Sequence, residues 1–300
     1  MNLPSWAQPA PLHPLELGWL KAAGVHVAIL RLDLIDPLIS GNKWFKLSEH
    51  IAAMGANGQA GIISLGGAHS NHLHALAAAG KRLGFCTVGL LRGHPQATPT
   101  VADLEAFGMQ LHWLGYGGYR QRHEAGFWTP WLAQYPDLLA VPEGGGGTAG
   151  ARGCQVLLAQ VQAQLPSLGW SGFDAWWLGV GTGTTLAGLV QAGGPRVYGA
   201  MAVPDGHGVA ENIAALLDDA AGFELVDACR GGFAKVDGPL LAFIQAAEEE
   251  SGVPLEPLYT GKALLALQEN LHRFARGTRL VFVHTGGLQG RRGLRPFSGV

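Results

Sequence analysis

The sequence is poor in charge and in cysteine. Only 14% of its 300 residues are charged, and 20 Lys and Arg stand against 22 Asp and Glu, giving a formal charge of -2. Without an excess of positive charge, we expect neither nucleic acid nor an anionic membrane among the partners. The three cysteines, Cys86, Cys154 and Cys229, are far apart and odd in number. They argue against a disulfide framework and against a thiolate metal site.

Long apolar runs are missing as well. No stretch is long enough to span a bilayer, and no basic segment followed by an apolar core opens the sequence, so we expect a cytoplasmic protein. Apolar residues nevertheless make up 48% of the chain, and there are 46 glycines. This length and composition suit one large α/β domain or two smaller ones.

Short apolar runs alternate with longer segments of helical period. The strands that we predict cover residues 25–32, 61–66, 86–91, 110–115, 138–142, 175–180, 196–203 and 279–284. The predicted helices cover residues 44–55, 70–83, 100–107, 149–164, 184–192, 208–219, 237–251 and 261–275. Strands that are apolar throughout and separated by helices are typical of parallel sheets covered on both faces. Ligands bind beyond the carboxyl ends of such strands, which is where the glycines cluster.

Residues 40–47 place a lysine just after a Ser-Gly-Asn turn, at the start of a predicted helix. The positive end of the helix dipole disfavours the ammonium form of Lys43 and so favours a lowered pKa. Only a neutral amine attacks a carbonyl, which makes Lys43 a candidate nucleophile. Taken alone, the motif also fits an exposed lysine in a loop.

Residues 66–74 follow a predicted strand and read Gly-Gly-Ala-His-Ser-Asn-His-Leu-His. Ser70 and Asn71 stand at a predicted helix start, where a hydroxyl and an amide can face a ligand, although Ser70 also fits a simple cap. Three histidines offer an alternative metal site: His69, His72 and His74. Residues two apart lie on different sides of a helix, and no Cys or carboxylate adjoins them, so we expect no metal.

Residues 179–185, with the sequence Gly-Val-Gly-Thr-Gly-Thr-Thr, follow another apolar strand. Backbone N–H groups and threonine hydroxyls at a helix N-terminus form an anion nest that suits a phosphate monoester. The segment lacks both the Gly-Lys-Ser/Thr end of a Walker loop and a G-x-G-x-x-G pattern followed by an acidic residue. A phosphate without a nucleotide is therefore the better interpretation, although a tight strand-to-helix turn also fits.

Two weaker motifs complete the set: Tyr-Thr-Gly-Lys at 259–262 and His-Thr-Gly-Gly at 284–287. The order and spacing of all five motifs resemble the 1-aminocyclopropane-1-carboxylate (ACC) deaminase/D-cysteine desulfhydrase family of tryptophan-synthase-β-like, fold type II enzymes, which use pyridoxal phosphate (PLP). The resemblance runs from about residue 10 to residue 290. It is strongest at GNKWFKL, LGGAHSNH, GVGTGTT, PLYTGKA and VFVHTGG.

The resemblance implies how the cofactor is bound. Lys43 would hold PLP as a Schiff base, and Lys46 would support its phosphate together with the loop at 181–185. Asn71 would donate a hydrogen bond to the phenolic oxygen, and Thr260 would sit near the pyridine nitrogen. The whole predicted cofactor-binding set is Lys43, Lys46, Asn42, Asn71, Gly181, Thr182, Gly183, Thr184, Thr185 and Thr260.

The resemblance also implies the substrate site and the domains. The predicted catalytic residues are Lys43, Ser70 and Tyr259, and the predicted substrate contacts are Ser70, Asn71, His72, Phe233 and Tyr259. The fold would be α/β with two domains, each an open, mostly parallel sheet flanked by helices, and with PLP in the cleft between them. A larger PLP-binding domain would comprise residues 1–43 plus 148–300, and 44–147 would form a smaller inserted domain. A homodimer is expected.

The residue after Tyr259 bears on the reaction. In the resembled family it is a glutamate in the deaminases and a threonine in the desulfhydrase-like members, and here it is Thr260. A hydroxyl cannot donate a full proton to the pyridine nitrogen, so the cofactor is a weaker electron sink. Opening a cyclopropane ring should demand more of that sink than expelling a good leaving group. We therefore expect D-cysteine desulfhydrase-like β-elimination from a small amino acid, giving a keto acid, ammonia and, from D-cysteine, sulfide.

Because of Phe233, several alternative functions stay open. Members of the resembled family commonly carry Gly-Tyr-Gly near this position, so a hydroxyl at the substrate is missing here. ACC deamination and PLP-dependent racemisation of an amino acid are alternatives, as is an inactive PLP-binding protein. A nucleotide-dependent oxidoreductase would instead use residues 179–185 on a Rossmann-like sheet, bind a nicotinamide and leave Lys43 without a role.

Overall fold

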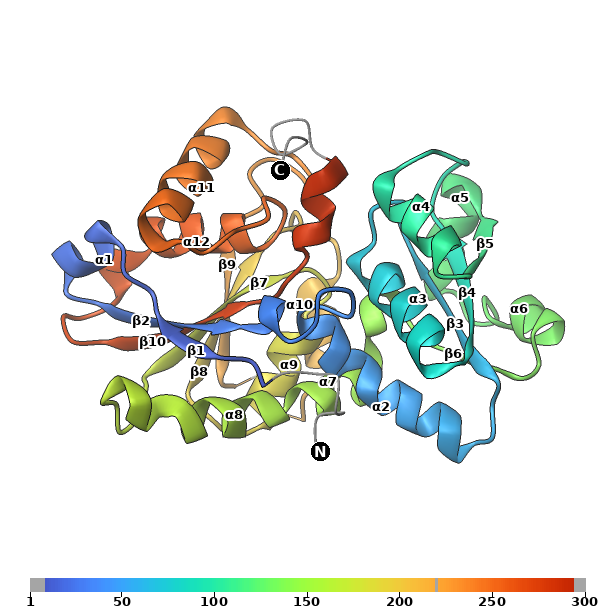
Figure 1. Cartoon of the computed structure of the whole chain (residues 1–300), viewed down its shortest axis with the longest axis horizontal. Coiled ribbons are helices and arrows are strands. Elements are labelled where there is room, and N and C mark those ends of the chain that lie inside the picture. The colour runs from blue at the N-terminus through green and yellow to red at the C-terminus, as the bar shows by residue number, and fades with distance from the viewer. Residues whose placement is uncertain (1–8, 219–220, 294–300) are drawn as a thin grey trace. The chain divides into compact units, whose positions relative to one another are not determined.

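The computed structural model describes residues 9–218 and 221–293, and the chain divides into two compact units (Figure 1). The first unit contains the chain up to Asn42 and Cys154–Leu288, and the second contains Lys43–Gly153 and the chain from Gln289 onward. The assignment of residues 1–43 plus 148–300 and of 44–147 to a cofactor domain and an inserted domain stays a prediction.

The first unit is built on a six-stranded sheet. Its strand order is β1-β2-β10-β7-β8-β9, and every neighbouring pair is parallel except β1 with β2. The strands are β1 (Leu12–Pro14), β2 (His26–Arg31), β7 (Ala175–Val180), β8 (Arg196–Met201), β9 (Phe223–Asp227) and β10 (Arg279–His284). The central strands are apolar on both faces because helices cover both, as expected of a parallel sheet.

Helices flank this sheet on its two faces. Helices α11 and α12 lie on one face, and α8 and α9 lie on the other (Figure 1). The bounds are α1 (Gly18–Ala23), α8 (Val156–Gln164), α9 (Thr184–Gln191), α10 (Val209–Ala214), α11 (Gly238–Ser251) and α12 (Thr260–Glu269). The glycine turn after β7 leads directly into α9, so the end of a central strand feeds a helix N-terminus. This is the arrangement that places ligand-binding turns in α/β sheets.

The second unit contains a four-stranded parallel sheet with the order β5-β4-β3-β6. Its strands are β3 (Gly61–Gly66), β4 (Cys86–Leu91), β5 (Gln110–Trp113) and β6 (Leu138–Ala140). Its helices are α2 (Asn42–Ala56, from its second residue), α3 (Asn71–Leu83), α4 (Pro99–Ala106), α5 (Gly115–Arg120), α6 (Thr129–Gln134) and α7 (Gly147–Cys154, up to Gly153). The prediction of an α/β chain with two mostly parallel sheets flanked by helices is confirmed.

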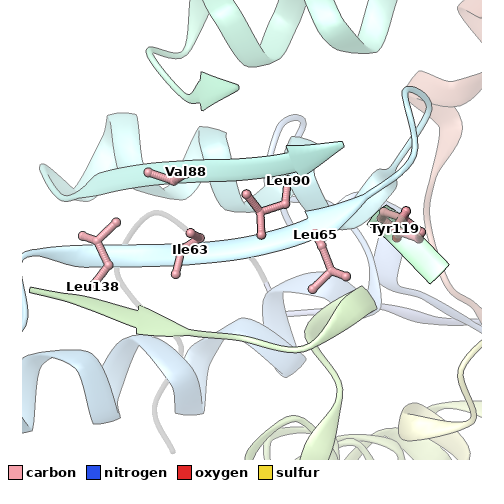
Figure 2. Close-up of a cluster of buried hydrophobic side chains, with 6 residues drawn as sticks. All are labelled: Ile63, Leu65, Val88, Leu90, Tyr119 and Leu138. Atoms are coloured by element: carbon pink, nitrogen blue, oxygen red, sulfur yellow. The ribbon is translucent and has the colours of Figure 1, made fainter. Parts of the chain in front are cut away.

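The core of the second unit follows the two-residue period of its strands. Ser64 of β3 bonds to His72 of α3, so Ile63 and Leu65 point to the opposite face of the sheet. There they join a buried cluster drawn in Figure 2, whose members are Ile63, Leu65, Val88, Leu90, Tyr119 and Leu138. Half-buried aromatic residues around α6, Phe127, Trp128 and Trp131 among them, close this cluster.

The structure corrects the sequence predictions in several places, and it also contains α1, α5 and α6, which were not predicted. Two strands, β1 and β9, were not predicted, since β1 has only three residues and β9 is half-buried with a mixed pattern. The single helix predicted at 149–164 is two helices, because the chain turns at Gln155 between α7 and α8. The helices predicted at 208–219 and 261–275 end at Ala214 and Glu269. Residue 219 lies outside the described part of the chain.

Within the described residues, no helix combines the length and the apolar character that crossing a membrane requires.

Candidate active site

The turn before Lys43 packs against the end of β10, main chain against main chain. Gly41 has a φ of 75°, and a Cβ added to it would lie 2.1 Å from the main-chain oxygen of Thr285. Asn42 N donates to the same oxygen at 3.1 Å. Only glycine fits this turn, both for its left-handed φ and for the close approach. The contact explains why the Ser-Gly-Asn and His-Thr-Gly-Gly motifs occur together.

Asn42 also contacts the glycine turn after β7. Its side-chain Nδ2 donates to Thr185 Oγ1 at 2.9 Å, and both residues are buried. Two motifs that are 143 residues apart in sequence are thereby joined within the first unit. The predicted cofactor contacts Asn42 and Thr185 therefore lie side by side.

The start of α9 fits a phosphate group. Gly183 caps the helix with a φ of 81° and with no side-chain hydrogen bond, so no side chain of the cap occupies the first N–H groups. Thr182 Oγ1 and Thr184 Oγ1 are 3.1 Å apart at this turn. A Cβ at Gly183 would come within 2.4 Å of Ile213, so the close turn depends on glycine. Backbone donors at a helix start with adjacent hydroxyls are what a phosphate monoester requires.

Tyr259 lies against the same glycine turn. A Cβ at Gly181 would be 3.0 Å from the Tyr259 ring, and one at Gly179 would be 2.9 Å from its main-chain oxygen. The ring centroid of Phe233 is 6.1 Å from that of Tyr259. Phe233 is 43% exposed, whereas Tyr259 is half-buried. Within the first unit, two of the predicted substrate contacts are therefore neighbours.

Helix α12 begins in a buried hydrogen-bonded turn around Glu256. The Glu256 carboxylate accepts N–H groups from Leu258 at 2.7 Å, Tyr259 at 2.7 Å and Thr260 at 2.6 Å. Burial raises the pKa of Glu256 to about 7, although the hydrogen bonds from the backbone oppose this rise. Thr260 is fully buried, and its hydroxyl donates to the main-chain oxygen of Glu256 at 3.1 Å.

The buried side chain of Lys262 donates hydrogen bonds to the loop that contains Phe233. Lys262 Nζ donates to the main-chain oxygens of Cys229 at 2.8 Å and Gly232 at 3.2 Å, and the residue is 1% exposed. Burial lowers the pKa of Lys262. The loop contains two non-glycine residues with positive φ, Arg230 at 53° and Ala234 at 61°. Because these conformations are unfavourable, the Lys262 hydrogen bonds help to hold the loop in shape.

In the second unit, α3 starts directly after the turn that follows β3. Ser70 caps the helix by accepting the N–H of Leu73 at 3.1 Å, which leaves its own proton for donation. Asn71, the first helical residue, is half-buried, and its Oδ1 accepts a hydrogen bond from Gln289 Nε2 at 2.9 Å. Lys43 of α2 is half-buried, and Lys46, one turn later, is 3% exposed.

The histidines of the second motif point away from a common centre. His72 is buried, with Nε2 2.8 Å from Ser64 Oγ, and burial together with Lys43 and Lys46 holds its pKa well below the usual range. His74 Nε2 lies 3.1 Å from Asp103 Oδ2. Among the described residues, no three His, Cys, Asp or Glu side chains gather as metal ligands would. The role of His72 as a substrate contact stays a prediction.

A buried ionic network lies at the ends of β2 and β10. Arg31 pairs with Asp33 through two hydrogen bonds, of 2.9 Å and 2.6 Å. His284 places Nδ1 3.1 Å from Asp33 Oδ1, and its Nε2 lies 2.7 Å from the main-chain oxygen of Pro254. These contacts hold His284, the first residue of the His-Thr-Gly-Gly motif, in place. The next residue, Thr285, contacts the turn before Lys43.

Several residues around the site carried no sequence signal that we used. Glu256 could have been noticed as an acidic residue just before a helix start, which is a capping signal. Lys262 was visible only as part of the Tyr-Thr-Gly-Lys motif. Gln289 lies 218 residues from Asn71, and no local pattern links such positions.

Within the first unit, the anion-binding start of α9 and the neighbouring Tyr259-Thr260 turn have the chemistry that a PLP phosphate and ring require. A family model described as pyridoxal-phosphate dependent enzyme matches residues 6–286, so the chain belongs to this family and uses PLP. The relatives that it matches include proteins named D-cysteine desulfhydrase and 1-aminocyclopropane-1-carboxylate deaminase.

Two relatives and one solved structure illustrate this placement. The D-cysteine desulfhydrase of Serratia proteamaculans is 28% identical over 290 residues, which covers 88% of this chain and 87% of that protein. The mitochondrial bifunctional D-cysteine desulfhydrase/1-aminocyclopropane-1-carboxylate deaminase of Arabidopsis thaliana is 26% identical over 333 residues, covering 96% and 82%. A crystal structure described as an ACC deaminase homologue matches with a TM-score of 0.84 and 25% identity, covering 98% of this chain and 94% of that one.

Proposed function

We propose that this enzyme catalyses β-elimination from a small amino acid, in the manner of a D-cysteine desulfhydrase. The observation that carries the proposal is the hydroxyl of Thr260, which gives its proton to the main-chain oxygen of Glu256 at 3.1 Å. That proton is then not available to a pyridine nitrogen, so the cofactor would act as a moderate electron sink. A moderate sink suits a good leaving group, such as thiolate or chloride, better than a cyclopropane ring.

The reaction removes the proton on the α-carbon and breaks the bond from the β-carbon to the leaving group. The released enamine then takes up water and gives a keto acid and ammonia. Bound PLP supplies the withdrawal of electrons from the α-carbon. We assign movement of the α-proton to Lys43 Nζ, because Lys43 is the predicted Schiff-base lysine and its amine can accept a proton once it is neutral.

The other residues bind and orient. The Ser70 hydroxyl already accepts from Leu73 N and can donate its own proton to the substrate carboxylate. The Asn71 amide would donate to the phenolic oxygen of the cofactor, and the turn at 181–185 would hold the phosphate, with Lys46 as a further predicted contact. The first helical turn of α9 suits this role because its cap, Gly183, has no side chain that could bond to the N–H groups.

Tyr259 and Phe233 would face the side chain of the substrate. Their rings are neighbours at 6.1 Å, and Phe233 is 43% exposed. Since Phe233 has no hydroxyl, Tyr259 is the member of this pair that can exchange a proton with the leaving group.

The deciding experiment is a screen of D-cysteine, L-cysteine, β-chloro-D-alanine and ACC for release of sulfide, keto acid and ammonia. We expect sulfide or chloride release with stoichiometric keto acid, and little ammonia from ACC. Faster ammonia release from ACC than from any cysteine would favour the deaminase alternative. Loss of optical activity without keto acid would favour a racemase.

Attachment at Lys43 is tested separately. The purified protein should be yellow, and borohydride should bleach the visible band and leave the mass of the reduced cofactor on the peptide containing Lys43. The variant Lys43→Ala should lose turnover. A cofactor mass on another lysine would contradict the assignment.

A further inference from the structure

The short helix η6 (Leu288–Gly293) packs on the start of α3. Gln289 Nε2 donates to Asn71 Oδ1 at 2.9 Å, and a Cβ at Gly290 would lie 3.6 Å from the same oxygen. A Cβ at Gly293 would lie 3.2 Å from the ring of His69. Residues from Gln289 onward belong to the same compact unit as α3. This turn therefore contacts Asn71 itself and His69, the residue before Ser70.

An ion pair anchors the turn. Arg292 pairs with Asp103 of α4, and Arg292 Nε also donates to the main-chain oxygen of Gln289 at 3.1 Å. His74 Nε2 reaches the same Asp103 carboxylate at 3.1 Å. Burial alone would raise the pKa of Asp103, but the hydrogen bond and charge of Arg292, and His74, lower it. Asp103 is thus ionised at neutral pH and ties Gln289 to α4 through Arg292.

The Gln289 contact selects one orientation of the Asn71 amide. Gln289 offers its NH2 group, so Asn71 presents its oxygen there, and the Asn71 NH2 group lies at the opposite edge of the planar amide. An amide without such a partner could rotate by half a turn and present its oxygen instead. Only the NH2 group can donate a hydrogen bond to an anionic phenolic oxygen.

We infer that Gln289 is a positioning residue, which holds the Asn71 amide with its NH2 group toward the phenolic oxygen of PLP. The inference rests on the proposed function in one respect, the assignment of Asn71 to the cofactor. A donor at the phenolic oxygen stabilises its negative charge and therefore lowers the pKa of the nitrogen that joins Lys43 to the cofactor. Gln289 thus sets the acidity of the Lys43 linkage without touching the cofactor.

The test is Gln289→Glu in the full, PLP-loaded protein. A carboxylate can only accept, so it turns the Asn71 NH2 group toward itself and the Asn71 oxygen toward the cofactor. We expect the pKa of the linkage, followed by visible absorbance, to rise by about one unit, and the dissociation constant of PLP to rise about tenfold. Gln289→Met, which leaves the amide undirected, should give a smaller change in the same direction.

Controls separate orientation from fold and from the proposed function. Gln162→Glu adds the same charge at an exposed position of α8 and should change neither quantity. Thermal unfolding of the Gln289 variants should stay near that of the wild type, because Gln289 is only half-buried. If Asn71→Ala raises both quantities and Gln289→Glu raises neither, the inference about Gln289 is overturned alone. If Asn71→Ala itself changes neither, the assignment of Asn71 to the cofactor fails.

Discussion

Thr260 and the main chain of Glu256 are joined by two hydrogen bonds. Glu256 N donates to Thr260 Oγ1 at 2.9 Å, and Thr260 Oγ1 donates to Glu256 O at 3.1 Å. The Glu256 side chain completes the turn by accepting three N–H groups at the start of α12. Because burial raises the pKa of this carboxyl group to about 7, the helix start that carries Tyr259 contains a group that titrates near neutral pH.

This titration predicts a pH dependence of stability. Between the ordinary pKa of 4.5 and about 7, folded protein holds a proton on Glu256 that the unfolded chain has lost. The free energy of unfolding should therefore fall as pH rises through this window, by about 3 kcal/mol from this group, and then level off. Urea unfolding at pH 5 and at pH 8 measures the change.

Glu256→Gln is the matched variant, because glutamine has the same shape and does not titrate. It should be less stable than the wild type, since its NH2 group opposes one of the three N–H donors. Its stability should nevertheless fall less between pH 5 and pH 8 than that of the wild type. An equal fall in both proteins would mean that Glu256 is ionised throughout this range.

The central strands were predictable because burial dictates their composition. The strands β3, β4, β7 and β10 were predicted with the bounds that the structure has, since strands covered on both faces are apolar throughout. The edge strands β1 and β9 escaped prediction because they are short or half-exposed and so lack that signal. The α7–α8 break escaped as well, since neither proline nor a cap marks it.

The sequence motifs of the candidate site could be predicted, but the long-range hydrogen bonds that hold those motifs in place could not. Gly41 and Gly183 stood out because turns with positive φ select glycine. The bond between Asn42 and Thr185 and that between Asn71 and Gln289 join positions 143 and 218 residues apart. Such long-range hydrogen bonds follow from tertiary packing, and no local pattern in a single sequence predicts them.

Thr185→Val should weaken the start of α9. The substitution keeps the shape of the side chain and removes the acceptor of Asn42 Nδ2, leaving a buried donor without its partner. We expect the free energy of unfolding to fall by about 1–3 kcal/mol and PLP to bind less tightly. Thr185→Ser, which retains the hydroxyl, should keep PLP binding close to that of the wild type. Equal losses in both variants would mean that the hydrogen bond from Asn42 is not what stabilises the start of α9.

Gly41→Ala tests the contact between the turn before Lys43 and the end of β10. The added Cβ meets Thr285 O at 2.1 Å in addition to the strain of a positive φ. We expect a loss of about 3 kcal/mol or more in the free energy of unfolding. Gly252→Ala is the control, because Gly252 has a φ of 67° and open space around its Cβ position. It should lose only about 1 kcal/mol, and an equal loss in both would contradict the close contact.

Phe233→Tyr tests whether the loop held by Lys262 faces the substrate. The new hydroxyl stands next to Tyr259, whose ring centroid lies 6.1 Å away, and adds a group that can exchange a proton with the leaving group. Since Phe233 is 43% exposed, the hydroxyl is not buried, and stability should change by less than about 0.5 kcal/mol. We expect kcat for sulfide release from cysteine, or for ammonia release from ACC, to rise about tenfold or more. Phe233→Leu, which removes the ring and adds no hydroxyl, should give no such rise. If Phe233→Tyr leaves kcat and KM unchanged for every substrate of the screen, Phe233 is not a substrate contact.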